Sequence, residues 1–160
     1  MAPVQLDDWQ RWQSQGFTHL PVAALVGEVD LPPSWDAVTA APATVLLESA
    51  QAGRYTYICE RAARVIVGRT DGAEILAADG SRLLGTRTGA PLAVLHALLA
   101  ERRTPPLPPG WPAMSGGLIG LFGYDLAHTW EKLPLITRRD LPLPLYAAIE
   151  PAAFLVYDHA

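Results

Sequence analysis

The chain has 160 residues and a formal net charge of −4, and half of its residues are apolar while 18% are charged. This composition predicts one folded domain with a substantial core and excludes a disordered chain. The basic residues form no stripe with interleaved aromatics, and no run approaches the roughly 18 apolar residues of a membrane span, so we expect neither nucleic-acid nor membrane binding. The single cysteine, Cys59, excludes an internal disulfide framework. Because the N-terminus also lacks a secretory-signal pattern, we expect a cytoplasmic protein.

The N-terminal part is expected to contain one clear helix. Apolar residues recur at helical spacing from Leu6 to Trp12, which predicts a helix over 6–15. The apolar, β-branched segment 20–29 is expected to form a strand. Ser34 is placed to cap a short helical turn that follows two prolines.

Residues 44–88 have the pattern of an antiparallel sheet. The compact apolar run 44–48 predicts a buried strand, and the next strand, 54–60, carries Tyr55, Tyr57 and Cys59 on one face. Two Asp-Gly pairs then separate apolar, β-rich runs, which is a strong hairpin signal. They predict a three-stranded meander with strands at 63–69, 73–78 and 81–85.

The helix signal is strongest at 90–103. Pro91 lies near its first turn, and Arg102 and Arg103 lie at the negative end of its dipole. The expected buried stripe consists of leucines: Leu92, Leu95, Leu98 and Leu99. The proline-rich segment 104–112 is expected to be extended, and a last strand is expected over 146–158. Many strands, few helices and hairpin turns together predict an α+β fold with a mainly antiparallel sheet rather than a doubly wound one.

The segment GGLIGLFGYDL, residues 116–126, has unusually dense glycines. Its spacing fits neither the dinucleotide fingerprint nor a phosphate loop, which would need Gly-Lys-Ser/Thr. We therefore expect a core strand over 117–124, in which the missing side chain of Gly120 lets a neighbouring element pack closely. Asp125 is expected to cap a short helix that turns Leu126, Trp130 and Leu133 inward. The residues of this structural motif are Gly116, Gly117, Gly120, Gly123, Tyr124 and Asp125.

Catalytic chemistry has little support in the residues. The four histidines are far apart in the sequence, and no nucleophile-base set is recognisable. His128 and Glu131 share a helical face, but two ligands do not make a metal site. Glu48 beside Ser49 is equally consistent with a strand end followed by a turn and with a functional position. We expect no catalytic or metal-binding residues within these 160 residues.

Five motifs in order resemble component I of the chorismate-utilising enzymes, a family that includes anthranilate synthase and aminodeoxychorismate synthase. The motifs are LLES (46–49), GRYTYI (53–58), GGLIGLFGYDL (116–126), WEKLP (130–134) and VYDHA (156–160). The pairing of GLFGYDL with WEKLP is more similar to the aminodeoxychorismate branch, which leads to 4-aminobenzoate and folate. The anthranilate branch shares LLES and the GYD segment, so it stays open as the alternative.

The resemblance implies a β-sandwich of two sheets with helices outside, of which residues 1–160 would be the N-terminal domain. It places the chorismate site, with Mg²⁺, in a C-terminal domain beyond this chain, so the 160 residues alone are expected to be inactive. It also implies a glutamine amidotransferase partner, separate or fused, that supplies ammonia. An alternative of another class is a stand-alone amino-acid-binding regulatory module.

The family's N-terminal region contributes to a tryptophan pocket, and the resemblance carries that role to three positions here: Ser49, Arg54 and Tyr55. A hydroxyl and backbone amides would hold the polar end of the amino acid, and aromatic or apolar side chains would take the indole.

Overall fold

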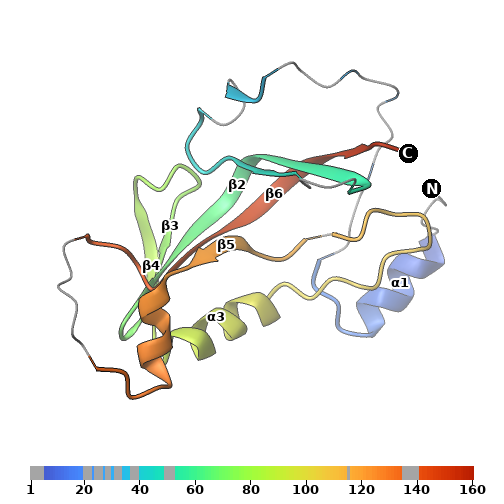
Figure 1. The fold of residues 1–160 in the computed structure, drawn as a ribbon. Helices are drawn as coiled ribbons and strands as arrows, with labels where there is room; N and C mark the ends of the chain where they lie inside the picture. Colours follow the sequence, from blue (N-terminus) through green and yellow to red (C-terminus); the bar gives the residue numbers. More distant parts are fainter. Residues whose placement is uncertain are drawn as a thin grey trace.

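The computed structural model describes residues 6–19, 23, 27, 30, 34–36, 40–48, 53–114, 116–134 and 141–160. In chain order its elements are α1 (Leu6–Ser14), β1 (Val45–Leu47), β2 (Tyr55–Arg69), β3 (Gly72–Leu76), β4 (Leu83–Thr88), α3 (Pro91–Ala100), β5 (Ile119–Phe122), the 3₁₀ helix η1 (Tyr124–Thr129) and β6 (Tyr146–Asp158). All pairings between the described strands are antiparallel, so the prediction of an α+β fold with a mainly antiparallel sheet is confirmed (Figure 1).

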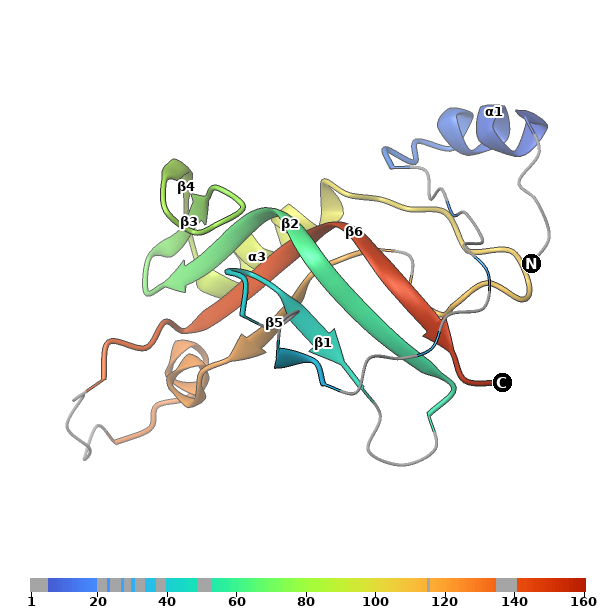
Figure 2. The ribbon, with the colours of Figure 1, turned by 90° about the horizontal axis from the view of Figure 1, so that it is seen from above.

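The sheet is built on two long strands, β2 and β6, which pair from Tyr55 opposite Asp158 to Gly68 opposite Tyr146. Figure 2 shows them as two long neighbouring ribbons. Along the other edge of β2, β1 pairs with the first half and β3 with the second, which gives the order β4-β3-β2-β6-β5 with β1 beside β2. The two strands predicted at 54–60 and 63–69 are one continuous strand, because register shifts near Arg61 absorb the irregular residues between them.

Helix α3 covers one face of the sheet. Val94 and Leu98 are buried against Ile66 and Ile75, whereas Leu92 and Leu99, expected in the buried stripe, are 38% and 43% exposed. The helix is rotated about its axis relative to the prediction, so that its i, i+3, i+7 positions 91, 94 and 98 face the sheet. The Tyr146 hydroxyl donates to the Pro91 carbonyl at 3.1 Å, which holds this face in place.

A second, smaller cluster lies on the opposite face of the sheet. It contains Cys59, Ala62 and Ile149, with Val45 and Phe154 packed against it. The described residues form a single sheet, so the two-sheet sandwich implied by the resemblance is not formed within this part of the chain.

The three predictions for the N-terminal part have different outcomes. The helix over 6–15 is confirmed as α1, and Ser34 Oγ accepts the backbone N–H of Asp36 at 3.1 Å, as a capping residue would. The strand expected at 20–29 lies almost entirely outside the described residues. Within the described part, no helix is both long enough and apolar enough to cross a membrane.

Candidate functional site

The glycine-rich segment lies at an edge of the sheet. β5 pairs with β6 from Ile119 opposite Ile149 to Phe122 opposite Tyr146, and no described strand pairs with its other side. The prediction of a core strand is therefore wrong for the described residues: β5 is an edge strand, and Leu121 and Phe122 are each more than 60% exposed. Alternation of apolar residues cannot show whether the far side of a strand is covered.

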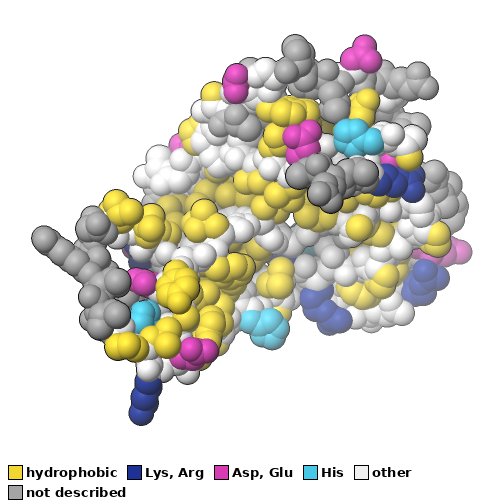
Figure 3. Space-filling model, viewed as in Figure 1, with side chains coloured by type: hydrophobic (Ala, Val, Ile, Leu, Met, Phe, Trp, Pro, Cys, Tyr) yellow, Lys and Arg dark blue, Asp and Glu magenta, His cyan; other side chains and the backbone are white. Residues whose placement is uncertain are grey.

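Several large apolar side chains are exposed around this edge. Six large residues there are more than half exposed, and together they define what we call the β5–η1 surface: Leu121, Phe122, Tyr124, Trp130, Leu141 and Leu143. Figure 3 shows apolar side chains gathered over the region of β5 and η1. Exposed apolar patches of this kind usually mark surfaces that bind another protein segment.

Gly120 brings β5 against β6 more closely than a side chain would permit. A Cβ built at Gly120 would lie 2.3 Å from the Ala147 carbonyl oxygen and 2.7 Å from Ala148 Cα. Both contacts are with backbone, which cannot rotate away as a flexible side chain could. The close approach expected from the sequence is thus made by β6.

Replacing Gly120 with valine is expected to lower the free energy of unfolding by about 1–3 kcal/mol, because β5 must move away from β6. Urea denaturation measures the change. Gly85→Val is the matched control, because Gly85 also lies in a strand and a Cβ there would meet no described atom within 4 Å. Equal stability of the two variants would contradict the close-packing role.

The other residues of the glycine motif shape the two ends of β5. Gly116 and Gly117 precede it, and Gly117 has φ of 105°, a conformation that favours glycine. Gly123 follows it and donates its N–H to the Leu145 carbonyl at 2.8 Å. The side chain of Tyr124, which begins η1, is 84% exposed.

The predicted helix after the motif differs from the observed one. η1 begins at Tyr124 with Gly123 in the cap position and no side-chain cap, so Asp125 lies inside the first turn rather than capping it. Leu126 is buried as predicted, but Trp130 is 57% exposed. The element is a 3₁₀ helix, whose three-residue turn does not keep positions 126 and 130 on one face.

Two of the three predicted ligand residues, Arg54 and Tyr55, lie at the opposite end of the sheet, and Ser49 falls outside the described residues. Arg54 immediately precedes β2 and Tyr55 begins it, beside the end of β6. The Arg54 guanidinium donates from Nε and Nη2 to the two carboxylate oxygens of Asp158, at 2.9 and 2.8 Å, and lies 5.0 Å from the centre of the Tyr55 ring. A ligand carboxylate would have to compete with Asp158 for Arg54. Arg54 and Tyr55 line neither the cavity between β4 and α3 nor the one beside β5.

Further polar contacts order this strand end. The fully buried Thr56 hydroxyl lies 2.8 Å from His159 Nε2, and the His159 ring packs edge-on against Tyr157. The sequence analysis did not predict that Thr56, Asp158 and His159 take part in these contacts, although the last two belong to the VYDHA motif. Their partners are more than 100 residues away in the sequence, and only the β2–β6 register brings them together.

The hydrogen bonds from Arg54 hold the pKa of the Asp158 carboxyl below its ordinary value, and the Ala160 backbone N–H and then the positive charge of Arg54 add to this lowering. The pair therefore favours the folded state at neutral pH, and this contribution is lost as the pH falls through the lowered pKa. Arg54→Met is expected to raise the pKa of Asp158 towards that of an ordinary aspartate, measured by NMR titration of the carboxyl carbon. Asp79 is the control, because hydrogen bonds from Ser81 lower its pKa and the substitution leaves them intact. An unchanged pKa at Asp158 would show that Arg54 does not cause the lowering.

A buried charge cluster joins the C-terminal end of α3 to the sheet. Arg64 Nε donates to Glu150 Oε2 at 2.6 Å, and both side chains are almost entirely buried. Arg102 Nε lies 2.8 Å from Glu150 Oε1, although its N–H is not directed along that line, so we regard this contact as electrostatic rather than as an aligned hydrogen bond. Arg102 Nη1 also contacts His19 Nε2. No sequence pattern could find this cluster, since its members come from four separate segments.

Among the described residues no three histidine, cysteine, aspartate or glutamate side chains come together as metal ligands. The charged groups described above are paired with one another, so the arrangement offers packing surfaces and ordered ion pairs.

No family model matches the chain. Several curated proteins do match it. The chain is 35% identical over 123 residues to anthranilate synthase component 1 of Thermus thermophilus, and the match covers 74% of this chain and 25% of that protein. The Mycolicibacterium smegmatis protein of the same name is 33% identical, covering 74% of this chain and 23% of its own length. The one from Neisseria meningitidis serogroup B is 27% identical, with 80% and 27% covered.

The chain belongs to the component I family of the chorismate-utilising enzymes. It spans about a quarter of the length of the component I relatives it matches. These relatives carry the name of the anthranilate branch, so the comparisons do not support the aminodeoxychorismate branch favoured by the GLFGYDL and WEKLP motifs.

Proposed function

We propose that this chain is the N-terminal domain of an anthranilate synthase component I, which in the complete protein converts chorismate and ammonia to anthranilate. The observation that carries the proposal is the shared name of its relatives at 27–35% identity over about three quarters of the chain. The ordered motifs from LLES to VYDHA support the same family. In this proposal the reaction centre, including bound Mg²⁺, belongs to the rest of the polypeptide, and a glutamine amidotransferase supplies ammonia.

The structural part of the proposal concerns the β5–η1 surface. We propose that it packs against the rest of the component I polypeptide. Three observations support a partner within the same polypeptide. The surface has six exposed apolar residues, and one side of β5 has no partner strand among the described residues. The relatives also continue for about three quarters of their length outside the part that this chain matches.

Product analysis of the full-length protein tests the reaction. Anthranilate formation releases the enolpyruvyl group of chorismate as pyruvate, whereas amination to 4-amino-4-deoxychorismate retains it. With chorismate, Mg²⁺ and ammonium, we expect fluorescent anthranilate and an equal amount of pyruvate, the latter measured with lactate dehydrogenase. Consumption of chorismate without pyruvate would contradict the anthranilate assignment and support the aminodeoxychorismate branch, the second candidate, which the GLFGYDL and WEKLP motifs favour. No consumption of chorismate would support a regulatory module instead.

Tryptophan binding near Ser49, Arg54 and Tyr55 remains a proposal. The aromatic rings of Tyr55 and Tyr57, with centroids 6.0 Å apart, offer a surface for an indole. Calorimetric titration of the full-length protein with tryptophan tests this, and the absence of heat at millimolar ligand would remove the assignment.

A further inference from the structure

Residues 16–19, which follow α1, lie against the chain just after α3, and we call them the N-terminal strap. The backbone N–H groups of Thr18 and His19 both donate to the Arg103 carbonyl, at 3.0 and 3.1 Å. The Arg103 guanidinium also lies 5.3 Å from the centre of the Phe17 ring. Thr18 and Arg103 are 85 positions apart in the sequence, so the strap joins α1 to the far end of α3.

The Thr18 hydroxyl is the centre of this contact. It donates to the Glu101 carbonyl at 3.0 Å and accepts the Arg103 backbone N–H at 3.0 Å. His19 Nδ1 lies 2.9 Å from the same oxygen. A hydroxyl has one proton to donate and two lone pairs, so one lone pair remains for a proton on Nδ1.

Arg102 fixes the protonation state of the His19 ring. Its Nη1 contacts Nε2 of the ring, and a guanidinium can only donate. Nε2 must therefore accept, which makes the imidazole neutral with its single proton on Nδ1. Both ring nitrogens are then satisfied, since Nε2 accepts from Arg102 and Nδ1 donates to Thr18. A second proton on the ring would set two donors and two positive charges against each other.

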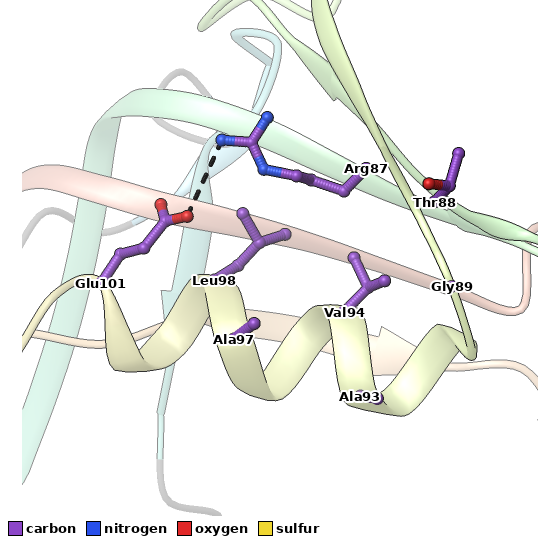
Figure 4. Close-up of a pocket in the computed structure, with 8 residues that line it drawn as sticks. All are labelled: Arg87, Thr88, Gly89, Ala93, Val94, Ala97, Leu98 and Glu101. Atoms are coloured by element: carbon purple, nitrogen blue, oxygen red, sulfur yellow. Dashed lines mark ion pairs between the residues drawn. The ribbon is translucent and has the colours of Figure 1, made fainter.

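The charged groups around this contact offer a protonated ring little compensation. Six charged side chains on α1, at the end of α3 and on the neighbouring strands form ion pairs with one another or with Arg102: Asp8, Arg11, Arg64, Arg87, Glu101 and Glu150. Figure 4 shows the Glu101 carboxylate directed towards Arg87 of β4. A proton on His19 would add a positive charge beside Arg102 and close to Arg103.

We propose that His19 is an acid-sensitive latch, which holds the N-terminal strap on the end of α3 while its ring is neutral and releases it when the ring takes up a proton. The proton removes the acceptor for Arg102 and repels its guanidinium. Histidine side chains change charge between about pH 5 and 8, so the latch acts in that range. It does not depend on which chorismate reaction the complete protein performs.

Hydrogen exchange of the full-length protein tests the latch, because the amides of Thr18 and His19 lose their acceptor when the strap opens. Their protection relative to the unfolded chain should fall about tenfold or more between about pH 8 and about pH 5.5, as expected when a hydrogen bond to a charged group is lost. His19→Gln should abolish this fall, since its amide oxygen can accept from Arg102 and does not titrate. His96→Gln is the matched control, because His96 is exposed on α3 and its loss should leave the fall unchanged.

A second measurement reads the ring directly. In NMR spectra of protein labelled with ¹⁵N-histidine at about pH 8, the His19 ring should carry its proton on Nδ1. Three results would overturn the proposal: protection that does not fall, an equal fall in His19→Gln, or a His19 proton on Nε2. Circular dichroism checks that each variant folds at both pH values. If His19→Gln does not fold, the position of the ring proton in the unmodified protein, assigned through its contact with Thr18, decides.

Discussion

Gly68→Ala is expected to lower the free energy of unfolding by about 3 kcal/mol, since its new methyl group would lie 2.4 Å from the ring of Tyr146. The Tyr146 side chain has no exposed surface, and its hydroxyl donates to the Pro91 carbonyl at the start of α3. The ring cannot move aside without disturbing the packing of α3 on the sheet. Gly68 therefore sets the space in which β6 and α3 meet.

Urea denaturation of the full-length protein measures this loss. Gly85→Ala is the control, because its methyl group would meet no described atom within 4 Å. The double variant Gly68→Ala with Tyr146→Leu should recover part of the stability lost in Gly68→Ala, since the smaller side chain relieves the clash. If Gly68→Ala is as stable as Gly85→Ala, the ring does not occupy the position described.

The second large effect is expected from Glu150→Ala, which should cost about 3–5 kcal/mol. The substitution leaves the Arg64 guanidinium, whose side chain is 13% exposed, without the carboxylate that it contacts at 2.6 Å. It also removes the carboxylate beside Arg102. Two positive groups would then lie together beneath the end of α3, and one of them, Arg64, has little access to water.

Glu74→Ala is the matched control, because it breaks the Arg69–Glu74 pair, which has a similar distance of 2.7 Å but is largely exposed. Its loss should stay below about 1 kcal/mol. Replacing Arg64 and Glu150 together with methionine and leucine should restore part of the stability, since the buried Arg64 charge is then gone and only Arg102 still loses its carboxylate. Similar small losses in Glu150→Ala and Glu74→Ala would show that the cluster is not buried in solution.

Local patterns predicted the elements whose signals lie within a few residues. Asp71-Gly72 and Asp79-Gly80 marked the turns of the meander, and helical spacing marked α1 and α3. The face of α3 that is buried could not be predicted, because leucines lie on several sides of it and the Tyr146–Pro91 contact decides between them. The edge position of β5 depends on strand order, which no local pattern encodes.

For the candidate sites too, features encoded locally could be predicted and contacts between distant residues could not. The motifs identified the family, and Gly120 was recognised because a glycine inside a strand needs a close neighbour. The pairs Arg54–Asp158 and Arg64–Glu150 join residues 104 and 86 positions apart, and they exist only because β2 and β6 run side by side. Charge alone could not select these partners among the other acids and arginines of the chain.

Burial of the β5–η1 surface by the rest of the component I polypeptide can be measured directly by hydroxyl-radical footprinting of the full-length protein. Tyr124 is the best reporter, because its side chain is 84% exposed in the structure described here. If the rest of the polypeptide covers this surface, Tyr124 should be oxidised at least tenfold more slowly in the folded full-length protein than in the same protein unfolded in urea. Oxidation of Tyr124 at nearly the unfolded rate would show that the surface stays open and would contradict its proposed contact with the rest of the polypeptide.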